Sequence, residues 1–142
     1  MVNFFKTTVV VFIVVFLIGI SLSHACNWDP LVNKCHPVRG EVVVYMDGDC
    51  QGIVYYSFNG NNRHEWSDLT TLIWPDQRGR LNDSISCYVI GHRTDFYYYE
   101  HINFGGKKVK ASNTYNDRLV QKSFKGNDWW NDRISSVKVF PK

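Results

Sequence analysis

Residues Trp130–Ser136 read WNDRISS, and they repeat the pattern of residues Leu81–Cys87, which read LNDSISC. Each stretch has a bulky residue, then Asn-Asp, one variable residue, Ile-Ser, and finally Ser or Cys. The two stretches are 49 residues apart. A recurrence of this kind indicates an internal duplication, and the fold is then built from two copies of one unit.

A second pair of motifs precedes the first pair in the same order. Residues 45–52 (YMDGDCQG) align with residues 99–106 (YEHINFGG) at an offset of 54. Both read aromatic residue, four intervening residues, a bulky or sulfur residue, one spacer and Gly. Two motifs that recur in the same order predict that residues 41–91 and 94–140 are two copies of one unit.

The region from Glu41 onward has the composition of an all-β domain. Short runs rich in Val, Ile, Tyr and Phe alternate with turn sequences such as DGD, NGNN and GG. Such spacing predicts a β-sandwich or a small barrel, with one faint helical turn around Trp66–Leu72. The predicted strands are Glu41–Met46, Ile53–Phe58, Ser86–Ile90, Asp95–Tyr99, Lys108–Ala111 and Ile134–Phe140.

The first 25 residues have the layout of a secretory signal peptide. Lys6 precedes an uncharged apolar run, Thr7–Leu22, and the small residue Ala25 suits the last position before cleavage. The alternative is an uncleaved membrane anchor, for which sixteen apolar residues are short against a span of about 20. We therefore expect a secreted, extracellular chain that begins at Cys26, within a residue or two, and keeps no membrane span after cleavage.

Charge and motif content exclude several classes of function. The formal net charge of +3 falls to +2 when Lys6 is removed, so nothing indicates the clustered basic face of a nucleic-acid-binding protein. The five histidines show no H-E-x-x-H spacing, and the chain has neither a G-x-S-x-G elbow nor a phosphate-binding glycine loop. We expect a protein that is not an enzyme.

All four cysteines, Cys26, Cys35, Cys50 and Cys87, lie in the mature part of the chain. An even number in an exported protein indicates two disulfides, and four cysteines allow three pairings. Thiolate binding of zinc has little support because no C-x-x-C pair occurs.

The duplicated motifs resemble the signatures of the βγ-crystallin superfamily. That family carries an aromatic-x4-Phe-x-Gly hairpin followed by Asn/Asp-Asn/Asp-x-x-Ser/Thr-Ser, and residues 131–136 match the second signature in full. The first copy departs from the pattern, with Cys50 at the usual Phe and Cys87 at the usual last Ser. The resemblance implies a domain over 41–142 in which two four-stranded Greek-key motifs form a sandwich, preceded by an extension over 26–40.

The two departures imply a disulfide pairing. In the family, the last Ser of the signature lies beneath the hairpin and hydrogen-bonds to it, so Cys87 would lie beneath the hairpin that carries Cys50. The resemblance thus implies a Cys50–Cys87 bond, which leaves Cys26 to pair with Cys35 in the extension.

The resemblance also implies up to two Ca²⁺ sites. The family uses the carbonyl of the third signature residue, the hydroxyl of the fifth, and a hairpin carbonyl from the partner copy. One site would then use Ser84, Ser86 and Ile102, and the other Arg133, Ser135 and Gly48. Neutral oxygens of this kind suit Ca²⁺. The alternative is that the Asn-Asp turns only satisfy backbone groups in their loops.

The biological role is left open between two hypotheses. The first is a calcium-binding extracellular protein with a structural or matrix role, stabilised by the ion and by disulfides. The second is a secreted effector on the same fold, such as a protease inhibitor, an antimicrobial protein or a toxin. An extracellular protein or a carbohydrate is a candidate target, with Trp129-Trp130 as either a core corner or a sugar platform. Asn82 begins an N-x-Ser sequon and is a candidate glycosylation site.

Overall fold

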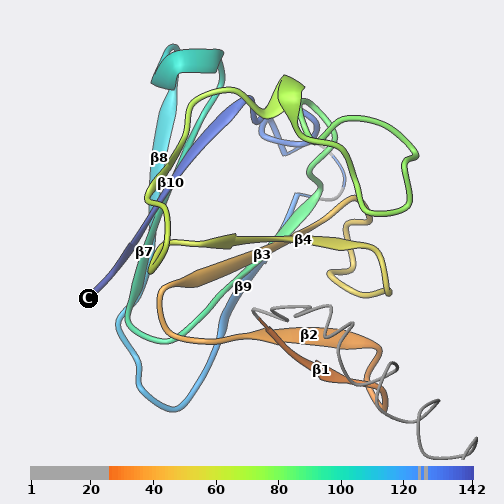
Figure 1. Cartoon of the computed structure of the whole chain (residues 1–142), viewed down its shortest axis with the longest axis vertical. Helices are drawn as coiled ribbons and strands as arrows, with labels where there is room; N and C mark the ends of the chain where they lie inside the picture. The colour runs from red at the N-terminus through yellow and green to blue at the C-terminus, as the bar shows by residue number, and fades with distance from the viewer. Residues whose placement is uncertain (1–25, 125, 127) are drawn as a thin grey trace, which may run out of the picture.

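Two four-stranded antiparallel sheets form the body of the protein (Figure 1). The structure is a computed structural model, and it describes residues 26–124, 126 and 128–142. The predicted signal peptide lies outside the described residues. In the part of the chain that the structure describes, no helix has the length and apolar character needed to cross a membrane.

The first sheet has the strand order β4-β3-β6-β9, and the second has the order β5-β10-β7-β8. The strands of the first sheet are β3 (Glu41–Tyr45), β4 (Tyr55–Asn59), β6 (Cys87–Ile90) and β9 (Val120–Ser123). Those of the second are β5 (Glu65–Trp66), β7 (Thr94–Tyr99), β8 (Lys108–Asn113) and β10 (Ser136–Pro141). Two short 3₁₀ helices complete this part, η1 (Leu69–Thr71) and η2 (Ile102–Phe104).

Each sheet contains one strand from the other half of the chain. Strand β9 belongs to the second half but pairs with β6, with Cys87 opposite Ser123. Strand β5 belongs to the first half but pairs with β10, with Trp66 opposite Val137. This exchange is how a Greek-key connection joins two sheets. The predicted all-β sandwich of two Greek-key motifs is confirmed, with all six predicted strands present at slightly different bounds.

The main core lies between the two sheets. It is rich in aromatic rings that meet edge to face, among them Tyr88 with Phe96 at 5.2 Å and Tyr98 with Trp130 at 4.8 Å between ring centroids. Such pairs contribute about 0.5–1.5 kcal/mol each beyond the burial of their area. Trp130 thus packs against the core as a corner, which is the simpler of its two predicted roles.

The residues before Glu41 form a separate hairpin, β1 (Cys26–Asp29) and β2 (Lys34–Pro37). This hairpin covers the outer face of the first sheet and makes a second small core, which includes Val43, Tyr45 and Val89. Strand β3 is therefore buried along its whole length, since its side chains meet a core on each face. A strand covered on both faces needs no polar alternation, which explains the continuous run EVVVY.

Candidate metal centre

The two signature loops contact each other through a reciprocal exchange of side chains. The hydroxyl of Ser86 lies 3.2 Å from Oδ1 of Asp132, and the hydroxyl of Ser135 lies 3.2 Å from Oδ1 of Asp83. The backbone repeats the exchange, because Asp83 donates its N–H to Ile134 and Asp132 donates its N–H to Ile85. Each loop thus supplies an aspartate to the serine of the other half.

The conformation of the loops holds both aspartates in place. Asp83 and Asp132 have φ values of 52° and 53°, in the left-handed region that Asn and Asp tolerate better than most residues. In each loop the preceding asparagine, Asn82 or Asn131, donates its side-chain amide to Oδ2 of the aspartate at 2.7 Å. Oδ2 is therefore oriented within its own loop, while Oδ1 faces the serine of the other loop.

A pocket of about 490 Å³ opens at this junction. Both aspartates line it together with Ser135, and the second-half hairpin adds Glu100 and His101. The hydroxyl of Ser135 lies 2.7 Å from the carbonyl oxygen of Glu100. Carboxylate, hydroxyl and carbonyl oxygens therefore meet at one place.

The family resemblance implies that each Ca²⁺ site takes a hairpin carbonyl from the other half of the chain. The structure instead places each signature serine beside the hairpin of its own half. Ser135 donates its N–H to Tyr99, and Ser86 donates its N–H to Tyr45, so each serine lies beside the hairpin of its own half. The reason is strand pairing, since β10 pairs with β7 and β6 pairs with β3. The groups that cross between the halves are the aspartate side chains.

The two hairpin residues assigned as ligands have other partners. The carbonyl of Gly48 accepts the hydroxyl of Ser123 on β9, and the carbonyl of Ile102 accepts the N–H of Gly105 within the hairpin turn. Beside Ser135 the structure places the carbonyl of Glu100 instead. A signal for the missed aspartates was present in the sequence, because both signatures contain an Asp at the second position.

The remaining predicted ligands, Ser84 and Arg133, lie in the signature loops themselves. The hydroxyl of Ser84 accepts the indole N–H of Trp74 at 2.9 Å and donates to the carbonyl of Arg80 at 2.6 Å, so it stabilises the conformation of the first signature loop. The guanidinium of Arg133 lies 4.9 Å from the ring of Trp129, where a cation–π contact holds it.

The donor set fits a hard cation. Its members are oxygens of Asp, Ser and the backbone, and Ca²⁺ takes six to eight oxygen ligands of these types. Among the described residues no group of three His, Cys, Asp or Glu side chains could hold a metal by itself, so hydroxyl and carbonyl oxygens would have to complete the set. The buried Oδ1 of Asn82 has no hydrogen-bond partner, which leaves one acceptor beside the loops unused.

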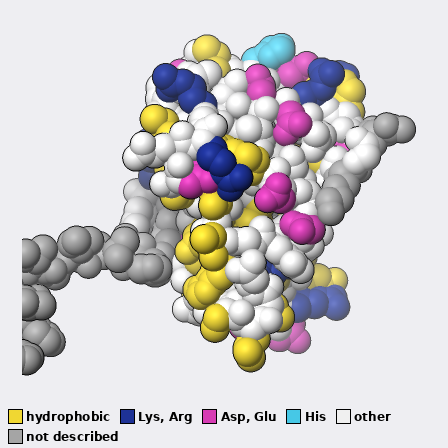
Figure 2. Space-filling view, turned by 90° about the vertical axis from the view of Figure 1, so that its right-hand side faces the viewer, with side chains coloured by type: hydrophobic (Ala, Val, Ile, Leu, Met, Phe, Trp, Pro, Cys, Tyr) yellow, Lys and Arg dark blue, Asp and Glu magenta, His cyan; other side chains and the backbone are white. Residues whose placement is uncertain are grey.

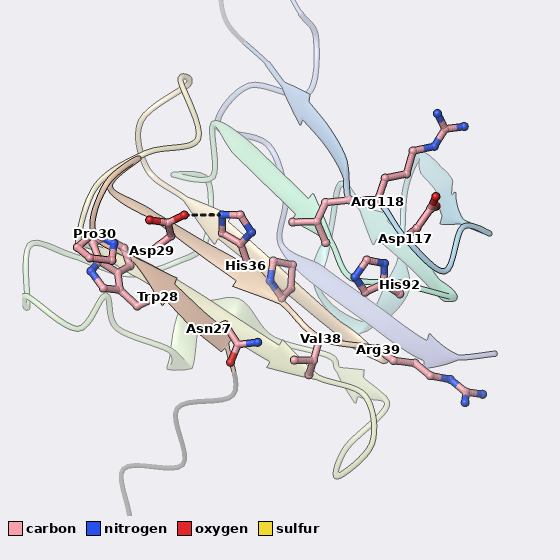
Figure 3. A pocket seen from close by; sticks show the side chains of 12 residues that line it. Asn27, Trp28, Asp29, Pro30, His36, Val38, Arg39, His92, Asp117 and Arg118 are labelled. Carbon is pink, nitrogen blue, oxygen red and sulfur yellow. Dashed lines mark ion pairs between the residues drawn. The ribbon is translucent and has the colours of Figure 1, made fainter.

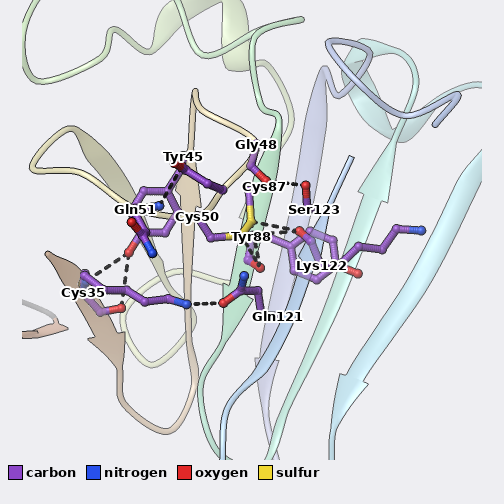
Figure 4. Close-up of a disulfide and its surroundings, with 12 residues drawn as sticks. Cys35, Tyr45, Gly48, Cys50, Gln51, Cys87, Tyr88, Gln121, Lys122 and Ser123 are labelled. Atoms are coloured by element: carbon purple, nitrogen blue, oxygen red, sulfur yellow. Dashed lines mark hydrogen bonds between the residues drawn. A yellow bond between two sulfur atoms is a disulfide. The ribbon is translucent and has the colours of Figure 1, made fainter. Parts of the chain in front are cut away.

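The hairpin of each half is fastened to the strand below it in a different way. In the second half, Ser136 accepts the N–H of Phe104 at 3.1 Å and donates its hydroxyl to the carbonyl of His101 at 2.7 Å. In the first half, Cys50 and Cys87 occupy the equivalent positions and form a disulfide, with Cα atoms 5.3 Å apart (Figure 4).

The two hairpins share a positive φ at this position, 59° at Cys50 and 62° at Phe104. The second disulfide joins Cys26 to Cys35 in the N-terminal hairpin, with Cα atoms 5.7 Å apart. Both predicted disulfides are therefore present, within the Cα range of about 4.4–6.8 Å that such bonds require.

Comparison with family models finds no match for this sequence, and comparison with curated proteins finds none either. Solved structures do match. A structure from work on the evolution of the eye-lens βγ-crystallin domain fold is 22% identical, with a TM-score of 0.58 over 75% of this chain and 91% of that one. Spherulin 3A from Physarum polycephalum is 22% identical, with a TM-score of 0.53 over 75% of this chain and 88% of that one.

A βγ-crystallin domain from Clostridium beijerinckii is 23% identical, with a TM-score of 0.50 over 70% of this chain and 95% of that one. These likenesses cover most of each matched chain. The protein therefore has the βγ-crystallin fold.

Proposed function

We propose that the protein is a secreted, non-enzymatic calcium-binding protein with a structural or matrix role outside the cell. The observation that carries the proposal is the reciprocal exchange, in which Asp83 reaches Ser135 and Asp132 reaches Ser86 across the two halves. An ion bound at either pair would contact both halves of the domain. Its binding free energy would then oppose their separation during unfolding.

The expected consequence is a gain in stability that depends on calcium concentration. A ligand that binds only the native state, present at ten times its dissociation constant, adds about 1.4 kcal/mol per site to the free energy of unfolding. Few formal charges per site favour an affinity near the extracellular range of about 10⁻⁴–10⁻³ M. Such sites would fill where calcium is plentiful, which fits a role outside the cell.

The test is isothermal titration with Ca²⁺ alongside thermal unfolding with and without Ca²⁺. Ser86→Ala and Ser135→Ala should each weaken one site and reduce the calcium-dependent rise in melting temperature. Ser112→Ala is a matched control, because Ser112 also donates its hydroxyl to an aspartate, Asp95, but on strand β8 away from the loops. It should leave the calcium response unchanged.

Two results would contradict the proposal. One is the absence of both heat and stabilisation with millimolar Ca²⁺. The other is an equal loss of response in Ser112→Ala and Ser86→Ala, which would mean that the hydroxyls act only through general stability. Either result would shift weight to the secreted-effector hypothesis, for which protease-inhibition and cell-toxicity assays are the measurements.

The sequon at Asn82 stays a prediction. Its side-chain amide already donates to Asp83, and its Oδ1 is buried. A glycan on Asn82 would require the side-chain amide to leave its hydrogen bond with Asp83 in the signature loop. Mass spectrometry of the secreted protein would show whether Asn82 is modified.

A further inference from the structure

Each sheet of the sandwich ends in two edge strands, β4 and β9 in the first sheet and β5 and β8 in the second. An edge strand presents unpaired N–H and C=O groups to which another strand can bond, so proteins normally place charges on such edges or keep them very short. Three of these edges follow that rule. Strand β8 carries the exposed Lys108 and Lys110, β9 carries the exposed Lys122, and β5 has only two residues.

Strand β4 (Tyr55–Asn59) has no such protection. It reads YYSFN, and neither a charged residue nor a proline occurs between Asp49 and Arg63. Uncharged segments rich in aromatic residues pair readily with other strands. In the described part of the chain, β3 is the only strand that pairs with β4.

The free side of β4 can be assigned to particular residues. The N–H of Gly60 donates to the carbonyl of Gly40 at 2.7 Å, which fixes the hydrogen-bonding phase of the β3–β4 pair. Backbone groups alternate in direction along an antiparallel strand, so Tyr56 bonds to β3, whereas Tyr55 and Ser57 direct their N–H and C=O groups away from it. Among the described residues these backbone groups have no hydrogen-bond partner, and both residues are partly accessible to solvent.

Exposed aliphatic side chains adjoin this edge. Ile53, just before β4, is 76% exposed, and Leu31, in the turn between β1 and β2, is 94% exposed. The two loops are joined, because the N–H of Gly52 donates to the carbonyl of Asn33 at 2.9 Å. Figure 2 looks at the end of the molecule where these loops lie, and it shows hydrophobic side chains gathered in the lower part of that face. Such a patch beside an unpaired edge indicates an interaction surface.

The N-terminal hairpin borders this surface without covering the edge. Trp28 faces the first sheet and stacks on Tyr55, with ring centroids 6.0 Å apart, which places β1 over β4. Asp29 and His36 lie on the opposite side of the hairpin, beside a pocket of about 810 Å³ (Figure 3). No residue of β4 lines this pocket. A foreign peptide laid along β4 would therefore not reach it, although side-chain pockets are what give such peptides their specificity.

The charge pattern favours a second copy of this chain as the partner. When two identical antiparallel strands pair about a twofold axis, a charge on the strand approaches the same charge on the other copy. Residues 50–62 carry no charge, so β4 can pair with itself without this repulsion. In the same arrangement of β8, Lys108 and Lys110 would repel their counterparts. Because each copy has one unprotected edge, the assembly closes at two copies.

We propose that β4 pairs with β4 of a second copy, antiparallel about a twofold axis at Tyr56, so that the first sheet continues into the other molecule. Tyr55 of each copy exchanges N–H and C=O bonds with Ser57 of the second copy. Ile53 of each copy then lies beside the end of β4 in the second copy and loses its exposure to water. The pairing does not depend on calcium, because none of these residues belongs to the signature loops.

The experiment combines sedimentation velocity with amide hydrogen exchange, followed by NMR on the ¹⁵N-labelled protein. Protein concentrations run from about 10 µM to about 1 mM, which covers weak as well as moderate affinities. We expect a dimer whose fraction rises with concentration and does not change with Ca²⁺. The amides of Tyr55 and Ser57 should exchange quickly in the dilute sample and slowly in the concentrated one. The amide of Tyr56 is an internal control, because it bonds to β3 and should be protected in both.

Tyr55→Lys should weaken the dimer at least about tenfold, because it places the lysines of the two copies about 7–8 Å apart across the paired strands. Tyr97→Lys is the matched control, since Tyr97 is also a partly buried strand tyrosine but lies on β7, inside the second sheet. If Tyr55→Lys fails to fold, the exchange measurement on the wild type decides alone.

Four results would overturn the proposal. The protein could stay monomeric up to about 1 mM, or it could form species larger than a dimer, which one edge per copy does not allow. A dimer in which the amides of Tyr55 and Ser57 stay unprotected would use another surface. An equal loss of the dimer in Tyr97→Lys and Tyr55→Lys would mean that added charge acts only through general stability.

Discussion

Glu41 makes the stability of the fold depend on pH. It is the first residue of β3 and is fully buried. Its carboxylate accepts the N–H of Val38 at 3.0 Å and the hydroxyl of Ser57. Burial raises the pKa of Glu41 from 4.5 to about 7, and the two hydrogen bonds oppose this shift without cancelling it.

The sign follows from the protons bound in each state. Between pH 4.5 and about 7 the native state holds a proton on Glu41 that the unfolded chain has lost, so the free energy of unfolding falls as the pH rises. A difference of about 2.5 pKa units corresponds to roughly 3 kcal/mol. This contribution is fully present below pH 4.5 and is lost as the pH passes through about 7.

Glu41→Gln should remove this dependence. A neutral amide can accept the N–H of Val38 and donate to the hydroxyl of Ser57, as the protonated carboxyl does. The variant should be about as stable as the wild type at pH 4.5 and about 3 kcal/mol more stable at pH 8–9. Urea unfolding without calcium at five or six pH values measures the difference.

The control is Glu65→Gln, because Glu65 is exposed and pairs with Lys138 at the surface. Exposed pairs contribute about 0–1 kcal/mol, so this variant should follow the wild-type curve to within that amount. The reasoning is refuted if Glu41→Gln and the wild type keep a constant difference from pH 4.5 to 9. It is also refuted if Glu41→Gln is less stable than the wild type at pH 8–9.

Two further changes test the covalent and steric features of the fold. Replacing Cys50 and Cys87 by Ser should lower the free energy of unfolding by about 4 kcal/mol, because the disulfide closes a loop of 37 residues and restricts the unfolded chain. Urea unfolding measures this change, and a curve that matches the wild type would contradict it. Gly91→Ala should prevent folding or expel the extension, because a Cβ there would lie 1.8 Å from the carbonyl oxygen of Val38. Gly105→Ala is its control, with neighbours no closer than 3.4 Å, and circular dichroism with limited proteolysis distinguishes the two.

Much of the fold could be predicted from the sequence because duplication makes each motif support the other. Strands β1 and β2 of the extension were not predicted. In the sandwich the strands missed were short or polar: β5 has two residues, and β9 reads VQKS, without the apolar alternation that marks a strand. Strands β5 and β9 are the two that cross between the sheets. They are held by pairing with β6 and β10, which are distant in sequence, so local composition carries little of the signal.

The site was predicted less completely than the fold. The motif picks out Ser86 and Ser135, and the structure places each of them beside the aspartate of the other loop. The side chains that contact these two serines come from the other half of the chain. How the two halves face each other cannot be predicted from the spacing of residues within one segment.

The two halves differ in what packs on their hairpins, because the extension contacts only the first one. The N–H of Gly52 in the first hairpin donates to the carbonyl of Asn33 at 2.9 Å, so that hairpin also supports the added β1–β2 layer. A disulfide fastens the first hairpin to β6, whereas in the second hairpin, which has no such layer, the hydroxyl of Ser136 occupies that place. Figure 2 shows basic and acidic side chains scattered over one face of the molecule. The added β1–β2 layer buries the outer face of the first sheet. The Cys50–Cys87 disulfide therefore belongs to the second core, which the extension adds to the duplicated fold.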